Sequence, residues 1–378
     1  MRPLLDFCSS RLDQLRVDIE TLVRLESPST DKAAVDRCGD ALSALLQTAG
    51  ATVSRVPQLT RGDHIVAEFG GGPASILILG HFDTVWNVGQ IDRMPLVEKE
   101  GRLYGPGIFD MKSSIAVSLL AMRALTELQV RAPRVTMLWT TDEEVGSQTS
   151  RAIIEAQAAR SDAVLVVEPS LPGGSAKTRR KGCGEFTFTA HGVPAHAGID
   201  PGKGASAIHE LAHQIVAIES MTDLDGGISV NVGTVSGGTR ANVIAEHATA
   251  SIDVRVPTMA DARRIEAAIR ALRPRHAGTR LGVEGGFDRP PLERTEGVAL
   301  VYEHARQAAA ALGRTLGEGG TGGGSDGNFT AALGVPTLDG LGPEGDGAHA
   351  LHEHVIIKDL PWRAAFLAAL MERLNTVK

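Results

Sequence analysis

A histidine and an aspartate stand two residues apart in Gly80-His81-Phe82-Asp83, directly after the apolar residues 75–79. Side chains of a strand alternate between its two faces, so His81 and Asp83 point to the same side at the end of a buried strand. This arrangement is typical of a metal-binding histidine whose imidazole is oriented by a nearby acid. For an isolated pair, a strand-end histidine beside a solvated aspartate is the commoner explanation. The metal-site interpretation therefore requires further candidate ligands elsewhere in the sequence.

Further candidate ligands follow predicted strands or turns. Asp110 comes after a glycine-rich turn, Glu143 and Glu144 follow an apolar strand, Glu168 ends another strand, and His349 lies in a Gly-Ala-His segment. Each alone could be a helix cap, an acidic first turn or a surface loop residue, but together they are more than coincidence. With the first histidine they offer nitrogen and oxygen donors and no thiolate. That set suits two zinc ions, with cobalt or manganese as substitutes.

Alternating helix and strand patterns must position these residues. The predicted helices cover residues 12–25, 33–49, 113–128 and 148–157, and the predicted strands cover residues 65–69, 76–80, 135–140 and 163–167. Strands separated by helices indicate an α/β fold whose mostly parallel sheet is covered on both faces. Ligands of such sheets gather at the carboxyl ends of the strands.

The pattern changes after Pro169. The predicted elements there are a strand at 185–190, a helix at 205–219, strands at 228–235 and 248–256, a helix at 260–272 and a strand at 280–285. This β-α-β-β-α-β order is ferredoxin-like, so we expect an inserted domain at residues 183–287. The catalytic domain is then discontinuous, residues 1–182 and 288–378. It resumes with a helix at 297–312 and a strand at 335–340, and closes with a helix at 360–374.

Length and composition narrow the class of protein. The 378 residues are too many for one ordinary core, and the net charge of -7 argues against nucleic-acid binding, for which the cluster Arg179-Arg180-Lys181 is too short. The sequence has no apolar run long enough to cross a membrane and no secretory leader pattern, so we expect a cytoplasmic enzyme. The three scattered cysteines indicate neither a disulfide framework nor a thiolate metal site.

Five motifs together resemble a known family. They are HFDTV at 81–85, GIFDMK at 107–112, DEEVGS at 142–147, EP at 168–169 and GAHALHE at 347–353. In this order they resemble the dinuclear zinc exopeptidases and deacylases, which include aminoacylase, succinyl-diaminopimelate desuccinylase and, most similar, the bacterial glutamate carboxypeptidases of the carboxypeptidase G type. The resemblance spans nearly the whole chain.

The resemblance implies a role for each metal-site residue. His81 and Glu168 would bind one zinc ion, Glu144 and His349 the second, and Asp110 would bridge both. His352 and His354 compete with His349, which we favour because Gly-Ala-His precedes it and Glu353 lies four residues later.

Two further residues would assist the metal site. Asp83 would orient the imidazole of His81, and Glu143 would be the general base of amide hydrolysis. A carboxylate that coordinates zinc is a poor proton acceptor, whereas its neighbour can take a proton from water and return it to the leaving nitrogen.

The inserted domain also carries matching residues. His196, in a segment that resembles the family's GxxxHAG, would stabilise the oxyanion. In several relatives this histidine comes from the partner subunit, so the resemblance implies that the inserted domain is a lid and dimerisation domain and that the protein is a homodimer through it. The resemblance further implies contacts to substrate carboxylates from a set of polar, basic and glycine residues, namely Asn242, Arg255, Arg289, Lys177, Gly323 and Gly324. Aligning Lys177 requires an insertion.

The expected function is therefore hydrolysis of an amide bond that releases a C-terminal amino acid, with glutamate favoured, from small peptides or N-acyl amino acids. An N-acyl-amino-acid deacylase shares all the metal residues and is the alternative within the enzymes. A catalytically inactive binding protein on the same fold is the alternative from another class, and the presence of Glu143 beside a complete ligand set argues against it.

Overall fold

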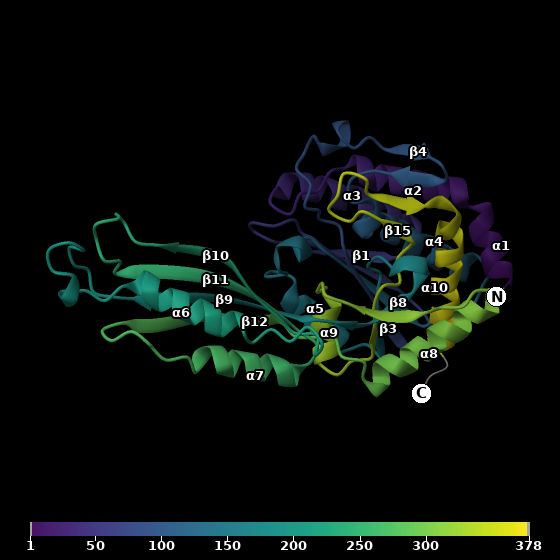
Figure 1. Ribbon diagram of the computed structural model, residues 1–378. Helices are drawn as coiled ribbons and strands as arrows, with labels where there is room; N and C mark the ends of the chain where they lie inside the picture. The colour runs from purple at the N-terminus through teal and green to yellow at the C-terminus, as the bar shows by residue number, and fades with distance from the viewer. Residues whose placement is uncertain (1, 376–378) are drawn as a thin grey trace. The chain divides into compact units, whose positions relative to one another are not determined.

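A computed structural model describes residues 2–375 as two units (Figure 1). Unit 1 consists of the residues up to Thr178, Arg294–Gly320 and those from Ser325 onward. Unit 2 consists of Arg179–Glu293 and Thr321–Gly324. Within the described residues, no helix combines the length and hydropathy that crossing a membrane requires.

Unit 1 is built around a six-stranded sheet with the order β1-β2-β6-β3-β7-β14. The strands are β1 Thr52–Val56, β2 His64–Phe69, β6 Arg134–Thr140, β3 Ser75–His81, β7 Ala163–Val166 and β14 Thr337–Leu338. The pairs β6–β3, β3–β7 and β7–β14 are parallel, and β2 is antiparallel to both of its neighbours. The predicted α/β fold with a mostly parallel sheet is therefore confirmed.

Helices cover both faces of this sheet because its central strands are apolar on both sides. On β3, Ile76 and Ile78 belong to one core, while Leu77 and Leu79 belong to another on the opposite face. The larger core includes residues of α1 Arg2–Ser10, α2 Leu12–Arg24, α3 Lys32–Thr48, α4 Ser113–Glu127, α8 Glu296–Ala311 and α10 Leu360–Leu374. The smaller core includes residues of α5 Arg151–Ala158 and α9 Gly327–Ala332.

Short strands build two smaller sheets. One has the order β15-β16-β5-β4, and the other pairs β13 with β8. Their bounds are β4 Val97–Lys99, β5 Arg102–Tyr104, β15 Gly345–Asp346, β16 His354–Ile356, β8 Ala176–Arg180 and β13 Glu318–Thr321.

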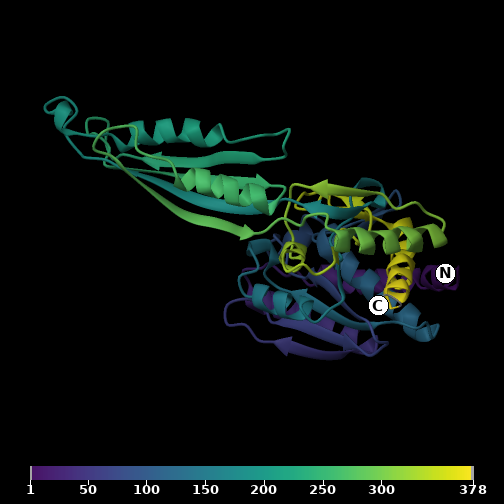
Figure 2. The same cartoon turned by 90° about the horizontal axis from the view of Figure 1, so that it is seen from below.

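Unit 2 has a four-stranded antiparallel sheet with the order β10-β11-β9-β12. Its elements follow one another as β9 Gly182–His191, α6 Ala207–Glu219, β10 Ser229–Gly237, β11 His247–Val256, α7 Met259–Arg270 and β12 Arg280–Arg289. Both helices lie on one face of the sheet (Figure 2), over Phe186 and Phe188 of β9. The ferredoxin-like arrangement is confirmed.

Several elements differ from the sequence expectation. The strand expected at 335–340 has only two residues in β14, and α5 begins at Arg151 rather than at residue 148. The sequence patterns did not indicate α1, β1, α9 or the short strands. Unit 2 begins four residues before the expected residue 183, ends six after 287, and includes residues 321–324 as well. Its action as a lid and dimerisation domain stays a prediction.

Candidate metal and active site

Three neighbouring parallel strands bring candidate residues to one edge of the unit 1 sheet. His81 is the last residue of β3, Glu143 and Glu144 follow β6, and Glu168 follows β7. The strand ends are in register, because His81 pairs with Thr140, the last residue of β6. The carboxyl ends of parallel strands are where ligands of such sheets bind.

His81 lies between two carboxylates. Its Nε2 is 3.4 Å from Oε1 of Glu168, and its Nδ1 is 3.4 Å from Oδ1 of Asp83. Nδ1 also lies 3.1 Å from the main-chain oxygen of Asp83, which can accept its proton. With the proton on Nδ1, Nε2 is unprotonated and faces Glu168, so its lone pair can bind a metal ion there. The other oxygen of Asp83 accepts hydrogen bonds from Ser29 Oγ (2.7 Å) and from the Glu144 N–H (3.3 Å).

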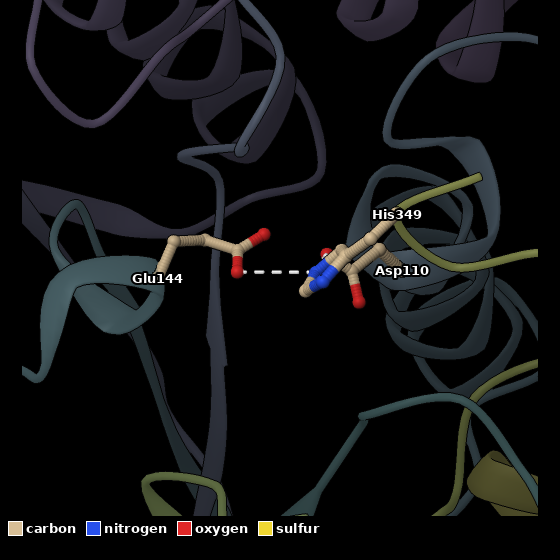
Figure 3. A group of neighbouring side chains, drawn as sticks. All are labelled: Asp110, Glu144 and His349. Atoms are coloured by element: carbon tan, nitrogen blue, oxygen red, sulfur yellow. Dashed lines mark ion pairs between the residues drawn. The ribbon is translucent and has the colours of Figure 1, made fainter. Parts of the chain in front are cut away.

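Asp110, Glu144 and His349 form a second group (Figure 3). Nε2 of His349 is 3.2 Å from Oε2 of Glu144 and 3.4 Å from Oδ2 of Asp110. One ligand atom of each residue lies within 4.8 Å of the others. Three residues that are far apart in the sequence thus offer ligands for one cation.

The structure separates the three histidines of the 349–354 segment. His349 contacts Asp110 and Glu144 from a left-handed backbone conformation, with a φ of 61°. His352 is exposed, and its Nε2 lies 3.9 Å from Oδ2 of Asp346. His354 is buried, with its ring centroid 5.0 Å from that of Tyr104. Only His349 among these histidines contacts both carboxylates of the second group.

The chemistry of the donors fits a divalent cation. Burial raises the pKa of Glu144 to about 7, and its Oε1 is buried without a hydrogen-bond partner. Hydrogen bonds to Asp110 and Glu144 raise the pKa of His349 to about 11. Burial alone would lower the pKa of His81, but hydrogen bonds to Asp83 and Glu168 raise it well above its usual value. This concentration of carboxylate charge is the kind that a bound metal ion offsets.

Glu143 occupies the first position of the short 3₁₀ turn Glu143–Val145. It is half-buried, and its negative charge acts on His81. A carboxylate in this position borders both groups of candidate ligands, since Glu144 belongs to the second group and His81 to the first.

Glu353 is a buried residue that holds the loop of Asp110. Its carboxylate accepts hydrogen bonds from the main-chain N–H groups of Gly107 (2.8 Å), Phe109 (2.9 Å) and Asp110 (3.1 Å), and from Nε1 of Trp86 (3.1 Å). From the sequence, Glu353 is noted only for its spacing from His349. The structure shows that it fixes the backbone from which the Asp110 side chain projects.

A glycine and a lysine also shape this loop. Gly107 has a φ of 69°, and a Cβ atom there would lie 2.6 Å from Cγ2 of Thr84, so a larger residue would be both strained and crowded. Lys112 is buried, and its Nζ donates to the main-chain oxygens of Leu22 and Leu25 at the end of α2. The turn around Asp110 is therefore tied to α2 as well as to Glu353.

A buried polar network holds the loop that carries Glu143 and Glu144. Asp142 Oδ2 accepts hydrogen bonds from the N–H (2.6 Å) and the hydroxyl (2.8 Å) of Thr149. His64 lies between two hydroxyls, with Nε2 3.1 Å from Thr149 Oγ1 and Nδ1 3.0 Å from Thr141 Oγ1. No sequence motif indicates a role for His64, which lies on β2, about eighty residues before the loop.

In unit 2, the structure brings together the segments of His196 and Asn242. The main-chain N–H of Ala197 donates to the main-chain oxygen of Asn242 (3.0 Å), and both side chains are exposed. Nδ1 of His196 accepts hydrogen bonds from the N–H groups of Gly198 and Ile199, both at 3.1 Å. Nδ1 is therefore unprotonated, and in the neutral ring the proton is on Nε2.

The other candidate substrate contacts of unit 2 gather around Cys183. The Arg255 guanidinium donates to Cys183 Sγ and is also paired with Asp253 at 2.7 Å. A Cβ atom at Gly324 would lie 3.1 Å from Arg289 Cδ and 3.2 Å from Cys183 Sγ. The glycine loop is held by Arg180, whose NH1 donates to the main-chain oxygens of Gly323 (3.2 Å) and Gly324 (2.9 Å). Lys177 belongs to unit 1, where it is buried and pairs with Asp339 through the main chain.

Comparisons with known proteins identify the family of this chain. Residues 77–373 match peptidase family M20/M25/M40. Carboxypeptidase G2 of Pseudomonas sp. (strain RS-16) is 32% identical over 374 residues, which cover 95% of this chain and 89% of the relative. Succinyl-diaminopimelate desuccinylase of Xanthomonas oryzae pv. oryzae is 30% identical over 359 residues, which cover 89% of this chain and 93% of the relative.

Solved structures show the same fold. Aminopeptidase PepT of Bacillus cereus has a TM-score of 0.81 at 22% identity and covers 96% of this chain and 98% of its own. A dinuclear metal-binding peptidase of family M20 from Bacillus subtilis has a TM-score of 0.71 at 15% identity, with 98% of this chain and 99% of its own covered. From the extent of the sequence match and the identity with carboxypeptidase G2, this chain belongs to peptidase family M20/M25/M40.

Proposed function

We propose that this hydrolase is a two-zinc exopeptidase that releases a C-terminal amino acid, preferentially glutamate, from small peptides or N-acyl conjugates. The observation that carries the proposal is the pair of ligand groups at one sheet edge, with Glu168 beside His81 and with Asp110 and Glu144 around His349. The family supplies the reaction class, hydrolysis by a metallopeptidase or amidohydrolase.

In this proposal His81 and Glu168 hold one zinc ion, Glu144 and His349 hold the other, and Asp110 is shared. The donor set of imidazoles and carboxylates fits zinc, and cobalt or manganese can substitute. When bound, two such ions polarise the amide carbonyl and lower the pKa of the attacking water. Asp83 keeps His81 in the required orientation through its contacts with Nδ1.

Glu143 serves as the general base. It takes a proton from the attacking water and later gives it to the leaving nitrogen, so one carboxylate serves both proton transfers. Its position beside Glu144 and within the electrostatic reach of His81 supports this role.

His196 stabilises the developing negative charge on the substrate oxygen. Because Nδ1 of His196 accepts two main-chain N–H groups, Nε2–H is the donor that the ring can offer. Asn242 belongs to the neighbouring segment and is proposed to bind the same substrate.

Arginine contacts support the preference for glutamate. Arg289, Arg255 and the loop at Gly323 and Gly324 surround one region of unit 2, and a guanidinium matches a carboxylate with two parallel hydrogen bonds. Asp253 already neutralises part of the charge of Arg255. Arg289 is therefore the stronger candidate for the substrate carboxylate, and Lys177 is the weaker one because its alignment needs an insertion.

A homodimer through unit 2 is part of the proposal. Among the described strands, β10 pairs only with β11 and is an edge of its sheet, and Val235 on this strand is 59% exposed. Val216 on α6 is also exposed. An open edge strand with exposed apolar neighbours favours pairing with a second copy of the chain. The expected cytoplasmic location stays a prediction.

A substrate panel on zinc-loaded enzyme tests the proposal. N-acyl glutamate, N-acyl alanine, N-acyl leucine, glutamate-terminated dipeptides and succinylated amines should be compared by kcat/KM. We expect the glutamate substrates to be hydrolysed fastest. If an alanine or leucine analogue is hydrolysed as fast as its glutamate counterpart, the glutamate preference is wrong.

The similarity to succinyl-diaminopimelate desuccinylase favours a second candidate function, an N-acyl-amino-acid deacylase. The two functions share the metal site and differ in the acyl group and the amine that are released. Faster hydrolysis of the succinylated amines than of any glutamate conjugate would select the deacylase.

A further inference from the structure

Helix α6 of unit 2 carries a second arrangement of metal-binding residues, none of which belongs to the candidate site of unit 1. Residues 209–213 read His-Glu-Leu-Ala-His, so two histidines stand four residues apart on one helix face. Both imidazoles are exposed. Paired histidines at this spacing are a known way for a helix to chelate zinc.

The two imidazoles already have the separation that a metal ion requires. Nε2 of His209 and Nε2 of His213 are 3.2 Å apart. A tetrahedral zinc ion with Zn–N bonds of about 2.0–2.1 Å holds two nitrogens about 3.3–3.4 Å apart. An ion can therefore bind both Nε2 atoms with little movement of the helix or of the rings.

A third imidazole stands beside this pair. The ring centroid of His276 is 5.0 Å from that of His209. His276 comes from the connection between α7 and β12, so it approaches α6 from a different part of the chain. The imidazole of His276 is therefore near enough to His209 to be considered as a third nitrogen donor.

Glu210 fixes the backbone of this third residue. Its carboxylate is buried and accepts hydrogen bonds from the N–H groups of Arg275 (3.0 Å) and His276 (2.6 Å) and from Thr279 Oγ1 (3.1 Å). In peptidases with this helix motif the glutamate is the general base. Here the glutamate faces the interior of unit 2, so the histidines are left as a binding site without that base.

We propose that His209, His213 and His276 form a surface site for a divalent transition metal, with zinc as the ion, that joins α6 to the α7–β12 connection. Three imidazoles without a thiolate suit zinc, nickel or copper more than calcium or magnesium. The bound ion stabilises unit 2 because it links two segments in the folded state that are separate in the unfolded chain.

Zinc binding by the full-length protein tests the site. Wild type, His213→Ala, His276→Ala and the control His304→Ala, which replaces a histidine on α8 in unit 1, are dialysed against micromolar free Zn²⁺ and their metal content is measured. We expect His213→Ala to bind one ion fewer than wild type and the control to bind the same number. His276→Ala should bind the same ion more than about tenfold less tightly.

A local measurement separates this site from the one in unit 1. Hydrogen exchange in residues 271–279 should slow when Zn²⁺ is added to wild type and to His304→Ala, but not to His213→Ala. A failure of the proposed two-zinc site would lower the metal content of all variants alike and leave the difference of one ion. Equal zinc content and equal exchange in wild type and His213→Ala would overturn the proposal and show that the two imidazoles merely share a hydrogen bond.

Discussion

Each unit of this molecule buries one glutamate that accepts several backbone N–H groups, yet the pKa values of the two shift in opposite directions. Burial and the charge of Asp110 raise the pKa of Glu353 in unit 1. Burial alone would also raise that of Glu210 in unit 2, but hydrogen bonds from Gln214, His276 and Arg275 outweigh it, and the pKa is lowered. The surroundings of Glu353 therefore disfavour its charged carboxylate, whereas the hydrogen bonds to Glu210 favour its charged carboxylate.

Glu353 holds the loop of a candidate site although burial of its charge is unfavourable there. Glu210 holds its loop in a setting that favours its charge, so it stabilises the fold. In unit 1 the anchored loop carries Asp110, and in unit 2 the anchored connection carries His276. Substitution of the anchor Glu353 should therefore lower turnover, whereas substitution of the anchor Glu210 should lower stability.

The largest effect is expected for Glu143→Gln, which removes the proposed base without removing a ligand. We expect kcat to fall by about 10²- to 10⁴-fold, because a general base contributes that much. Metal content and thermal stability should match wild type, as measured by elemental analysis and calorimetry. Unchanged turnover would remove Glu143 from the mechanism.

Glu353→Ala should come next. Three main-chain N–H groups and the indole of Trp86 lose their acceptor, and the loop of Asp110 loses its position. We expect kcat to fall by about 10- to 100-fold together with weaker metal binding. Glu68→Ala, at an exposed position of β2, is the matched control, and a similar loss in both variants would show that Glu353 has no special role.

Glu210→Ala tests the unit 2 side of the comparison. Leaving the N–H groups of Arg275 and His276 without their acceptor should cost about 1–3 kcal/mol of the free energy of unfolding. Denaturant unfolding measures this, with the exposed Glu246→Ala as control. A loss of kcat without a loss of stability would contradict the division between the units.

Arg289→Lys probes recognition in unit 2. The lysine keeps the positive charge but lacks the planar fork that binds a carboxylate bidentately. We expect kcat/KM for a glutamate substrate to fall about tenfold, mainly through KM, while a leucine analogue is affected less. An equal fall in kcat/KM for both substrates would mean that Arg289 does not bind the glutamate side chain.

The smallest effect is expected in the pH dependence of stability. Since the folded-state pKa of Glu210 is lowered, the unfolded chain binds more protons near the ordinary glutamate pKa of about 4.3. The contribution of Glu210 is complete above that pH and is lost as the pH falls below it. Unfolding of wild type and Glu210→Gln between about pH 3 and pH 6 should therefore show a shallower pH slope for the variant.

The sequence predicts the parts of the site that follow long periodic elements. His81 ends an apolar strand, and Glu144 and Glu168 come shortly after two others. These strands can be recognised from the sequence, and their parallel arrangement explains why the three residues meet. The short strands β15 and β16, of two and three residues, carry no periodicity, so the position of His349 relative to His352 and His354 needed the structure.

Residues that hold a distant loop in place, such as Glu353, cannot be predicted from the sequence for a different reason. Glu353 acts on a loop more than two hundred residues away, and no local pattern encodes such a contact. The spacing of His209 and His213 is visible in the sequence, whereas the contact of Glu210 with the His276 N–H and the proximity of the His276 ring are visible only in the structure.

The segment 321–324 also has a consequence for recombining this protein with its relatives. Unit 2 is not one continuous insertion, because these four residues return to it, and Lys181 N donates to Thr321 O while Arg180 holds Gly323 and Gly324. A graft that exchanged only residues 179–293 would leave part of the recipient's own loop inside a foreign unit. A functional chimera therefore needs two exchanged cassettes, and the shorter one has four residues.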